Sequence, residues 1–307
     1  MDAETVRIFR PTGITGPTGA SVAGAHLFHL DEDASVSALA LAANSTVGLN
    51  EWPRYGADDM YFHVGFAARN AVTCVELAEL GAHGSETALD GAAGLFAALR
   101  RSDRVDQVHP FERDHFEILD VFHKPAGACN YAQTATQAAL QLATTEDFTS
   151  RDIANIRILC TDAALNYPGC NAEGPFARVL QAKMSIRFCV AATLANAGVE
   201  ETNFRNLQDP EIERLVASTI LEADPALTAA LSRSARHRGH PCPTRWPRTS
   251  PPSHGPRPRH GIRHPRALRK IRHRRHRRAA TIAVAGMIDN LEKQDNIGAL
   301  AALLQAK

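Results

Sequence analysis

The sequence predicts a mainly α-helical protein that carries a smaller segment of mixed α and β structure. Apolar residues recur at helical spacing over residues 1–115 and again over residues 279–307, whereas strand-like alternation is confined to the middle of the chain. A composition with 44% hydrophobic but only 6% aromatic residues is typical of a helical protein rich in Ala and Leu. An excursion into a second domain, followed by a return to the first, would produce this order.

Residues 10–45 predict a glycine-rich loop followed by helices. Gly13, Gly16 and Gly19 punctuate the loop, and small residues then lead into a helix. Asp31 is expected to cap a further helix, because its carboxylate can accept hydrogen bonds from the amides of the first turn. The residues at helical spacing that should face the core of this helix are Val36, Leu39, Ala40 and Ala43.

Residues 50–60 predict a loop, and residues 62–84 predict a second long helix. Gly81 or Gly84 is expected to end this helix, because glycine readily adopts the left-handed backbone that closes many helices. A short helix is expected within residues 92–101. The apolar stripe predicted for the long helix consists of Val64, Ala68, Val72, Val75 and Leu80.

The sequence pattern changes after about residue 116, where strand-like segments occur among the helical ones. Ile156, Ile158 and Cys160 alternate with Arg157 and Leu159, which predicts a half-buried strand over residues 153–160. Asp209 and Pro210 are typical of the start of a helix, with the aspartate as its cap. The other expected elements are a strand running into a turn over 116–127, a helix over 131–143, a helix or helix pair over 174–198, and a strand over 220–227.

These elements suggest four segments. Residues 1–115 are expected to form an all-α domain and residues 116–232 an α+β domain. Residues 279–307 are expected to return to the helical domain as C-terminal helices. The intervening residues 233–278 are a basic segment without hydrophobic periodicity, so they are expected to lack a packed core.

The basic segment dominates the charge of the chain. It holds 15 Arg, one Lys, seven His and eight Pro, and it has no Asp or Glu. Without it, 18 basic residues stand against 33 acidic ones, so the remainder of the chain is acidic and a poor partner for nucleic acid. The segment is either a true basic arm, which would bind RNA or DNA non-specifically, or an out-of-frame translation between two compensating shifts. We favour the second interpretation, because no nucleic-acid-binding module flanks the segment.

Other features of the sequence narrow the class of protein. No run approaches 18 consecutive apolar residues, so we expect no membrane span, and the first residues lack the pattern of an export signal. Six cysteines are scattered without a Cys-x-x-Cys pair, which favours reduced thiols in the cytoplasm over a metal site or a disulfide framework.

Four stretches of the sequence, in order, resemble the MmgE/PrpD family, which includes 2-methylcitrate dehydratases, cis-aconitate decarboxylase and an iminodisuccinate epimerase. Residues 9–49 resemble the family's His-Pro-Thr loop with the two helices after it, and residues 62–94 its His-x-Gly-x-Ala-Ala segment. Residues 123–140 are similar to the Lys-x-x-Pro-x-Cys stretch, and residues 182–199 to the Ala-Lys-Phe-Ser helix. The resemblance covers roughly residues 9–231 and resumes in the C-terminal helices.

The resemblance implies a fold and a chemistry. The fold would be an all-α domain holding a smaller α+β lid, here partly disrupted, in a homodimer with a substrate cleft between the domains. The chemistry would be that of a lyase working without metal or organic cofactor on small di- or tricarboxylates. A proton is removed from a carbon next to a carboxylate, and water or CO₂ is then lost, or the carbon is reprotonated as in an isomerase or epimerase.

The resemblance also implies a set of site residues. His63 and Lys124 match positions expected to be catalytic, and Lys183 and Ser185 match positions expected to bind substrate. Thr12 matches the loop threonine, and amides at a helix start can bind anions. Arg10 stands where the family has a probable proton-transfer histidine. Arginine stays protonated, so it can hold a carboxylate but cannot act as a base.

Departures from the family pattern bear on activity. Met60 stands where relatives often have a lysine, and Phe188 where a tyrosine is common. The resemblance also implies a helical portion before the loop, with a further site histidine, that this sequence does not show. Since one general acid or base typically supplies about 10²–10⁴ in rate, the alternatives to a lyase or isomerase include an inactive remnant that binds carboxylates. A nucleic-acid-associated protein acting through residues 233–278 is a further alternative.

Overall fold

The computed structural model describes residues 4–108, 121 and 123–238. The chain divides into two units, Met1–Trp246 and Pro247–Lys307, and every described residue belongs to the first. Helices dominate the described residues, and their strands form one two-stranded sheet, so the predicted mainly α fold is confirmed. None of the described helices is long and apolar enough to cross a membrane.

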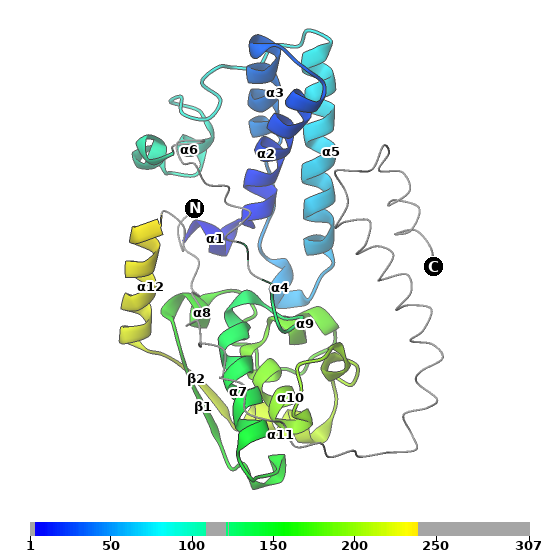
Figure 1. Ribbon diagram of the computed structural model, residues 1–307, viewed down its shortest axis with the longest axis vertical. Helices are drawn as coiled ribbons and strands as arrows, with labels where there is room; N and C mark the ends of the chain where they lie inside the picture. Colours follow the sequence, from blue (N-terminus) through cyan, green and yellow to red (C-terminus); the bar gives the residue numbers. More distant parts are fainter. Residues whose placement is uncertain (1–3, 109–120, 122, 239–307) are drawn as a thin grey trace, which may run out of the picture. The chain divides into compact units, whose positions relative to one another are not determined.

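Three helices lie side by side in the first part of the chain, as Figure 1 shows. They are α2 (Pro11–Leu27), α3 (Glu32–Asn44) and α5 (Asp59–Glu79). Asp31 caps α3 as predicted, because its carboxylate accepts a hydrogen bond of 2.9 Å from the amide of Ala34. Gly81 follows the end of α5 with a φ of +90°, so the predicted glycine closure of this helix is also confirmed.

The glycine-rich loop predicted at the start of this region is wrong. The helix α2 begins directly at Pro11, and Gly13, Gly16 and Gly19 lie inside it. These glycines serve packing rather than a turn: a Cβ added to Gly16 would lie 2.9 Å from the Cβ of Ala67 on α5. The absence of side chains lets the helices approach closely, and this gain outweighs the poor helix propensity of glycine.

The predicted apolar stripe of α5 is also mostly wrong. Val75 is buried, but Val64, Val72 and Leu80 are exposed to 55%, 51% and 84%. The face that packs against α2 and α3 is made of smaller residues instead, because these helices approach too closely for large side chains. Its buried residues are His63, Ala67, Ala71, Cys74, Val75 and Ala78. On α3, likewise, Val36 is exposed, whereas Ala40 and Ala43 are buried as predicted.

Short elements connect these helices to the rest of the chain. The first is α1 (Thr5–Ile8), after which Phe9 forms an antiparallel bridge with Leu49. The predicted loop over 50–60 contains one helical turn, α4 (Trp52–Tyr55), and it ends where α5 begins. The predicted short helix is α6 (Leu95–Ala98), and the 3₁₀ helix η1 (Ser102–Gln107) follows it.

The second part of the described chain mixes helices with strands. The predicted helix over 131–143 is α7 (Gln133–Thr145), preceded by η3 (Asn130–Ala132), and the predicted helix pair is α9 (Val179–Met184) with α10 (Ile186–Asn196). Asp209 caps α11 (Pro210–Ala217), as predicted, through the amides of Glu211 and Ile212. The remaining elements are η4 (Ser150–Asp152), α8 (Asp162–Asn166), η5 (Glu201–Phe204) and α12 (Pro225–Arg238).

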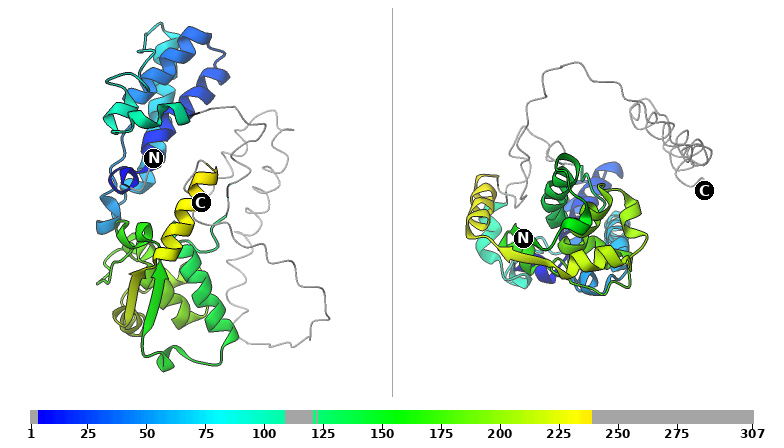
Figure 2. Two further views of the ribbon diagram at one scale, coloured as in Figure 1. Left: turned by 90° about the vertical axis from the view of Figure 1, so that its left-hand side faces the viewer. Right: turned by 90° about the horizontal axis from the view of Figure 1, so that it is seen from below.

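The two strands pair in parallel. They are β1 (Ile156–Cys160) and β2 (Thr219–Ala223), and Ile156 lies opposite Thr219 (Figure 2). Both strands were predicted, and Ile158 is buried between the exposed Arg157 and Leu159, as the alternation indicates. The second strand is shorter than predicted, because Pro225 already starts α12. That helix also includes residues 233–238, so the first six residues of the basic segment are helical.

The core of the second part is built around α10. Residues Ile186 to Leu194 of this helix are all buried, and α7 and α11 pack against it. Phe188 is almost fully buried between Phe176 and Phe204, with ring centroids 5.1 and 5.8 Å away. The position where relatives often have a tyrosine is therefore a core position in this chain.

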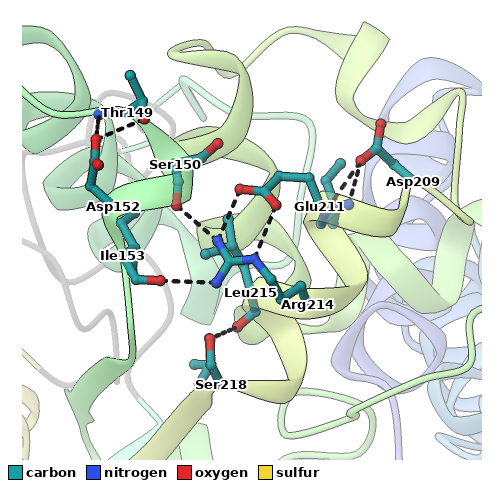
Figure 3. Close-up of polar contacts among 11 residues, drawn as sticks. Thr149, Ser150, Asp152, Ile153, Asp209, Glu211, Arg214, Leu215 and Ser218 are labelled. Carbon is teal, nitrogen blue, oxygen red and sulfur yellow. Dashed lines mark hydrogen bonds and ion pairs between the residues drawn. The ribbon is translucent and has the colours of Figure 1, made fainter.

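One arginine fastens α11 to the segment before β1. Arg214 donates to the carbonyls of Ser150 at 2.8 Å and Ile153 at 2.9 Å, and it forms a paired contact with the carboxylate of Glu211 (Figure 3). In the same segment, Thr149 and Asp152 close η4 with a capping box. These bonds hold the start of β1 beside the helix that leads into its partner strand.

Some predictions fall outside the described residues. A strand running into a turn was expected over 116–127. Residues 116–120 and 122 of this range lie outside the described part, and the chain bends within residues 123–128. Residues 239–278 of the basic segment and the helices expected over 279–307 also lie outside the described part.

Candidate functional site

A cluster of polar and aromatic side chains surrounds the start of α2. We call it the Arg10 cluster, and its members are Arg10, Asn50, Trp52, His63 and Tyr167. Arg10 is the residue directly before α2, so its side chain leaves from the positive end of the helix dipole. Thr12 lies in the first turn of this helix, where backbone amides lack partners within the helix.

The guanidinium of Arg10 reaches across to α4 and α5. It donates from Nη1 to the carbonyl of Met60, and its central carbon lies 5.8 Å from the ring centroid of Trp52. Among the described residues, no carboxylate forms an ion pair with Arg10. Burial lowers the pKa of Arg10, and the nearby Tyr167 opposes this effect, but arginine remains charged at any working pH. The cluster therefore contains a partly buried cation without an anion.

His63 lies on the buried face of α5, with only 9% of its surface exposed. Its Nδ1 atom is buried and has no hydrogen-bond partner. Burial lowers the pKa of His63 below 6.5, and the charge of Arg10 lowers it further, while Asp59 raises it. The imidazole is therefore neutral at pH 7, which is the state that can accept a proton.

Two further members of the cluster also have buried polar atoms without partners. Asn50 is 2% exposed, and it donates to Tyr167 and to the carbonyl of Val6 while its own Oδ1 atom stays unpaired. Trp52 is 5% exposed, and its indole N–H is unpaired. A buried polar group without a partner costs free energy, so three of them around one arginine indicate a place for a polar ligand or for water.

Sequence reasoning found Arg10, Thr12 and His63 but missed the other members of this cluster. Asn50 and Trp52 lie in the segment predicted as a loop, and Tyr167 lies just after α8, about a hundred residues further along the chain. The only signal in the sequence was the presence of Asn, Trp and Tyr in connecting segments, where functional residues are often found.

A pair of tyrosines connects the Arg10 cluster with a second group of predicted residues. The ring of Tyr167 lies 5.3 Å from that of Tyr131, which precedes α7. Burial raises the pKa of Tyr131 to about 12, and Tyr167 and Cys129 raise it too. Both hydroxyls therefore stay protonated at neutral pH and can act as hydrogen-bond donors.

Lys124 lies in the turn before η3, which we call the Lys124 turn and define as residues 124–129. Its ammonium donates to the carbonyl of Ala128 at 3.3 Å, and the side chain is exposed. Gln133 is buried beneath the turn and donates to three of its carbonyls, those of Ala126, Ala128 and Cys129. The turn is thus fixed to α7, and Lys124 is displayed on a rigid base.

Lys183 and Ser185 lie at the junction of α9 and α10. The ammonium of Lys183 pairs with Glu201 at 2.6 Å and lies over the ring of Phe204, and its carbonyl accepts from the amide of Cys129. Ser185 is fully buried, and its hydroxyl donates to Ala172 at 2.6 Å while it caps α10 by accepting from Phe188. In this structure both side chains therefore have protein partners.

The predicted residues therefore fall into two groups, one near Arg10 and one near the Lys124 turn. Arg10, Thr12 and His63 lie in one, and Lys124, Lys183 and Ser185 lie in the other. Within the described residues, no three His, Cys, Asp or Glu side chains are placed to hold a metal ion. The first group combines an unpaired cation, a neutral imidazole and unpaired donors, which is a chemical arrangement for binding and deprotonating an anionic molecule.

The fold and the Arg10 cluster thus define a mainly α protein with a candidate site for a small anion. Comparison with family models identifies it further. The MmgE/PrpD N-terminal domain matches residues 1–107, and the MmgE/PrpD C-terminal domain matches residues 127–241. The chain therefore belongs to the MmgE/PrpD family. A search of curated proteins gave no match.

Proposed function

We propose that this chain binds a small di- or tricarboxylate at the Arg10 cluster. The observation that carries the proposal is the unpaired guanidinium of Arg10 beside a buried, neutral His63. A carboxylate would supply the anion that Arg10 lacks, in the planar paired geometry that guanidinium groups favour. The amides at the start of α2 and the indole N–H of Trp52 provide further donors for the same ligand.

The reaction that fits these groups is removal of a proton from a carbon next to a bound carboxylate. His63 is the proton acceptor in this proposal, because it is neutral and Arg10 cannot take a proton. Loss of water would then make the chain a hydro-lyase of the 2-methylcitrate dehydratase type. Reprotonation of the same carbon would make it an isomerase or epimerase.

Lys124 is the second catalytic group of the proposal, since its ammonium is exposed and makes one long hydrogen bond, of 3.3 Å, to the turn that carries it. We assign Lys183 only a supporting role in substrate binding. Its ammonium pairs with Glu201, and this pair would have to break before the ammonium could reach a ligand. Ser185 would contribute through the cap that fixes α10, since its hydroxyl is fully buried. We further propose a cytoplasmic homodimer as the working form.

Calorimetric titration of the full chain with citrate tests the binding. We expect Arg10→Ala to weaken binding roughly ten- to hundredfold, since a hydrogen bond to a charged group contributes about 1.5–3 kcal/mol. Arg54→Ala is the matched control, because Arg54 is an exposed arginine on the neighbouring α4. An equal loss of citrate affinity in both variants would show that the affinity depends only on net charge, and it would contradict a specific site.

Assays for dehydration, decarboxylation and epimerisation then separate the enzyme from a carboxylate-binding remnant. Turnover that is lost in His63→Gln, with citrate binding retained, would support the assignment of His63 as the base. Binding by the unmodified chain without turnover of any di- or tricarboxylate would favour the inactive remnant. If citrate-like ligands neither bind nor react, the proposal is wrong.

A further inference from the structure

Two cysteine thiols face each other next to the Lys124 turn. The Sγ atoms of Cys129 and Cys170 lie 3.7 Å apart, although the residues are far apart in the sequence. Cys170 is completely buried in the core, whereas Cys129 is partly exposed. Among the described residues, these are the two sulfur atoms that lie close enough to each other to form a hydrogen bond.

The backbone holds both cysteines in place. The amide of Cys129 donates to Lys183 at 2.8 Å, and its carbonyl accepts from Ala132 and Gln133. The amide of Cys170 donates to Tyr167 at 3.1 Å, and its carbonyl accepts from Ile186 at 2.9 Å. The approach of the two sulfurs is therefore part of the fold, and it does not depend on a long flexible side chain.

The surroundings make the two thiols chemically unequal. The hydrogen bond from Cys170 lowers the pKa of Cys129, and the charge of Lys124 acts in the same direction against the effect of burial. The hydrogen bond with Cys129 and burial both raise the pKa of Cys170. Cys129 is thus the sulfur that more readily becomes a thiolate, and Cys170 is the neighbouring thiol that can donate to this thiolate.

We propose that Cys129 and Cys170 are an oxidisable pair that closes to a disulfide when the chain meets a peroxide. The Cys129 thiolate attacks one oxygen of the peroxide, the O–O bond breaks, and the other oxygen leaves with a proton as water or an alcohol. Cys129 then carries a sulfenic acid. The Cys170 sulfur attacks the sulfenic sulfur, the S–O bond breaks, the hydroxyl leaves with the Cys170 proton as water, and the S–S bond forms. Two thiols are oxidised and one peroxide is reduced.

The other buried cysteines are poorer partners. The thiol of Cys189 is buried and directed at the carbonyls of Ala182 and Lys183, at 3.6 and 3.8 Å. Burial raises the pKa of Cys189, and that of Cys160 too. A disulfide requires the sulfurs of Cys129 and Cys170 to close from 3.7 Å to about 2.05 Å. Cys170 belongs to the core, so we expect the partly exposed Cys129 to make most of this movement.

Peroxide treatment of the full chain tests the proposal. We expect the loss of two thiols per chain, a peptide in which Cys129 and Cys170 are linked, and complete recovery with dithiothreitol. In Cys170→Ala the sulfenic acid has no resolving thiol, so dimedone should label Cys129. In Cys129→Ala both the linked peptide and the dimedone label should disappear, and Cys160→Ala, the control, should behave like the unmodified chain.

Several results would overturn the proposal. One is a disulfide that joins Cys129 to a cysteine other than Cys170, and another is a disulfide between two chains. A third is an unmodified chain whose thiols stay unchanged at the peroxide concentration at which dimedone labels Cys129 in Cys170→Ala. The main measurement uses the unmodified chain, so it does not depend on the folding of a variant, and far-UV circular dichroism checks each variant. Because no carboxylate ligand is needed, the result is independent of the proposed carboxylate site.

Discussion

At the scale of single residues, burial and the charge of Arg10 together lower the pKa of the neighbouring His63. Burial and the Arg10 charge both disfavour the imidazolium. A carboxylate bound to Arg10 would cancel part of this charge, so it would raise the pKa of His63 back toward 6.5. Ligand binding and proton uptake are therefore linked through two adjacent side chains.

This linkage predicts that citrate binds with uptake of a proton at pH values between the lowered pKa of the free His63 and its ordinary value of 6.5. The affinity should rise as the pH falls through this range. Titrations in buffers with different ionisation enthalpies measure the uptake directly. His63→Asn should remove the uptake at His63. Undiminished uptake in that variant would show that another group takes the proton.

A second prediction at this scale concerns Glu211. Its hydrogen bonds with Arg214 (Figure 3) and with Ser150 lower its pKa to about 2, from an ordinary value of 4.5. The stabilisation that the carboxylate gives is fully present above pH 4.5 and is lost as the pH falls toward 2. Glu211→Gln should flatten the dependence of the urea midpoint on pH in this range. Glu213→Gln is the control, because it removes an acid from the same helix but leaves the Arg214 pair intact.

At the scale of secondary structure elements, small residues decide how α2 meets α5. We predict that Gly16→Ala destabilises the chain by about 1–3 kcal/mol, because its new methyl group would lie 2.9 Å from the Cβ of Ala67. Gly19→Ala meets nothing within 4 Å and should stabilise the helix by about 0.5–1 kcal/mol. Urea unfolding of both variants measures the difference. If both changes stabilise, the close approach of the two helices is wrong.

The same elements show what the sequence could predict and why some predictions failed. The caps at Asp31 and Asp209 were correct, because a cap depends on a few neighbouring residues. The buried face of α5 was mostly wrong, and Val36 of α3 was wrong too, because size was read as a sign of burial. Alanine and glycine make the tight contacts here, while Val64 and Val72 are exposed. Helix spacing is a tertiary property that a hydrophobic pattern does not contain.

At the scale of the whole molecule, the outer face of α5 predicts self-association. Phe62 and Phe66 are 57% and 44% exposed, and their rings stack 6.0 Å apart. Exposed apolar patches tend to bind other surfaces. We expect the double change of Phe62 and Phe66 to Gln to shift the chain toward monomers in sedimentation velocity. The change Ile220→Gln, at an equally exposed apolar residue on β2, should leave the distribution unchanged.

The candidate site was predictable only in part. The family resemblance supplied Arg10 and His63, because motif positions can be matched residue by residue. It could not supply Asn50 and Trp52, whose importance comes from buried atoms left unpaired by the fold, or Tyr167, which the fold brings to Asn50. The pairing of Cys129 with Cys170 was hidden for the same reason: scattered cysteines in a sequence do not reveal which sulfurs meet.

The parallel pairing of β1 with β2 also has a consequence for the order of folding. The helices α2, α3 and α5 can pack as soon as the first third of the chain has been synthesised. The sheet cannot form until Thr219 has left the ribosome, because Ile156 pairs with it across the whole of α8 to α11. Such distant contacts close slowly. During translation, β1 therefore stays unpaired until β2 emerges, and unpaired strand edges of this kind make a folding intermediate prone to aggregation.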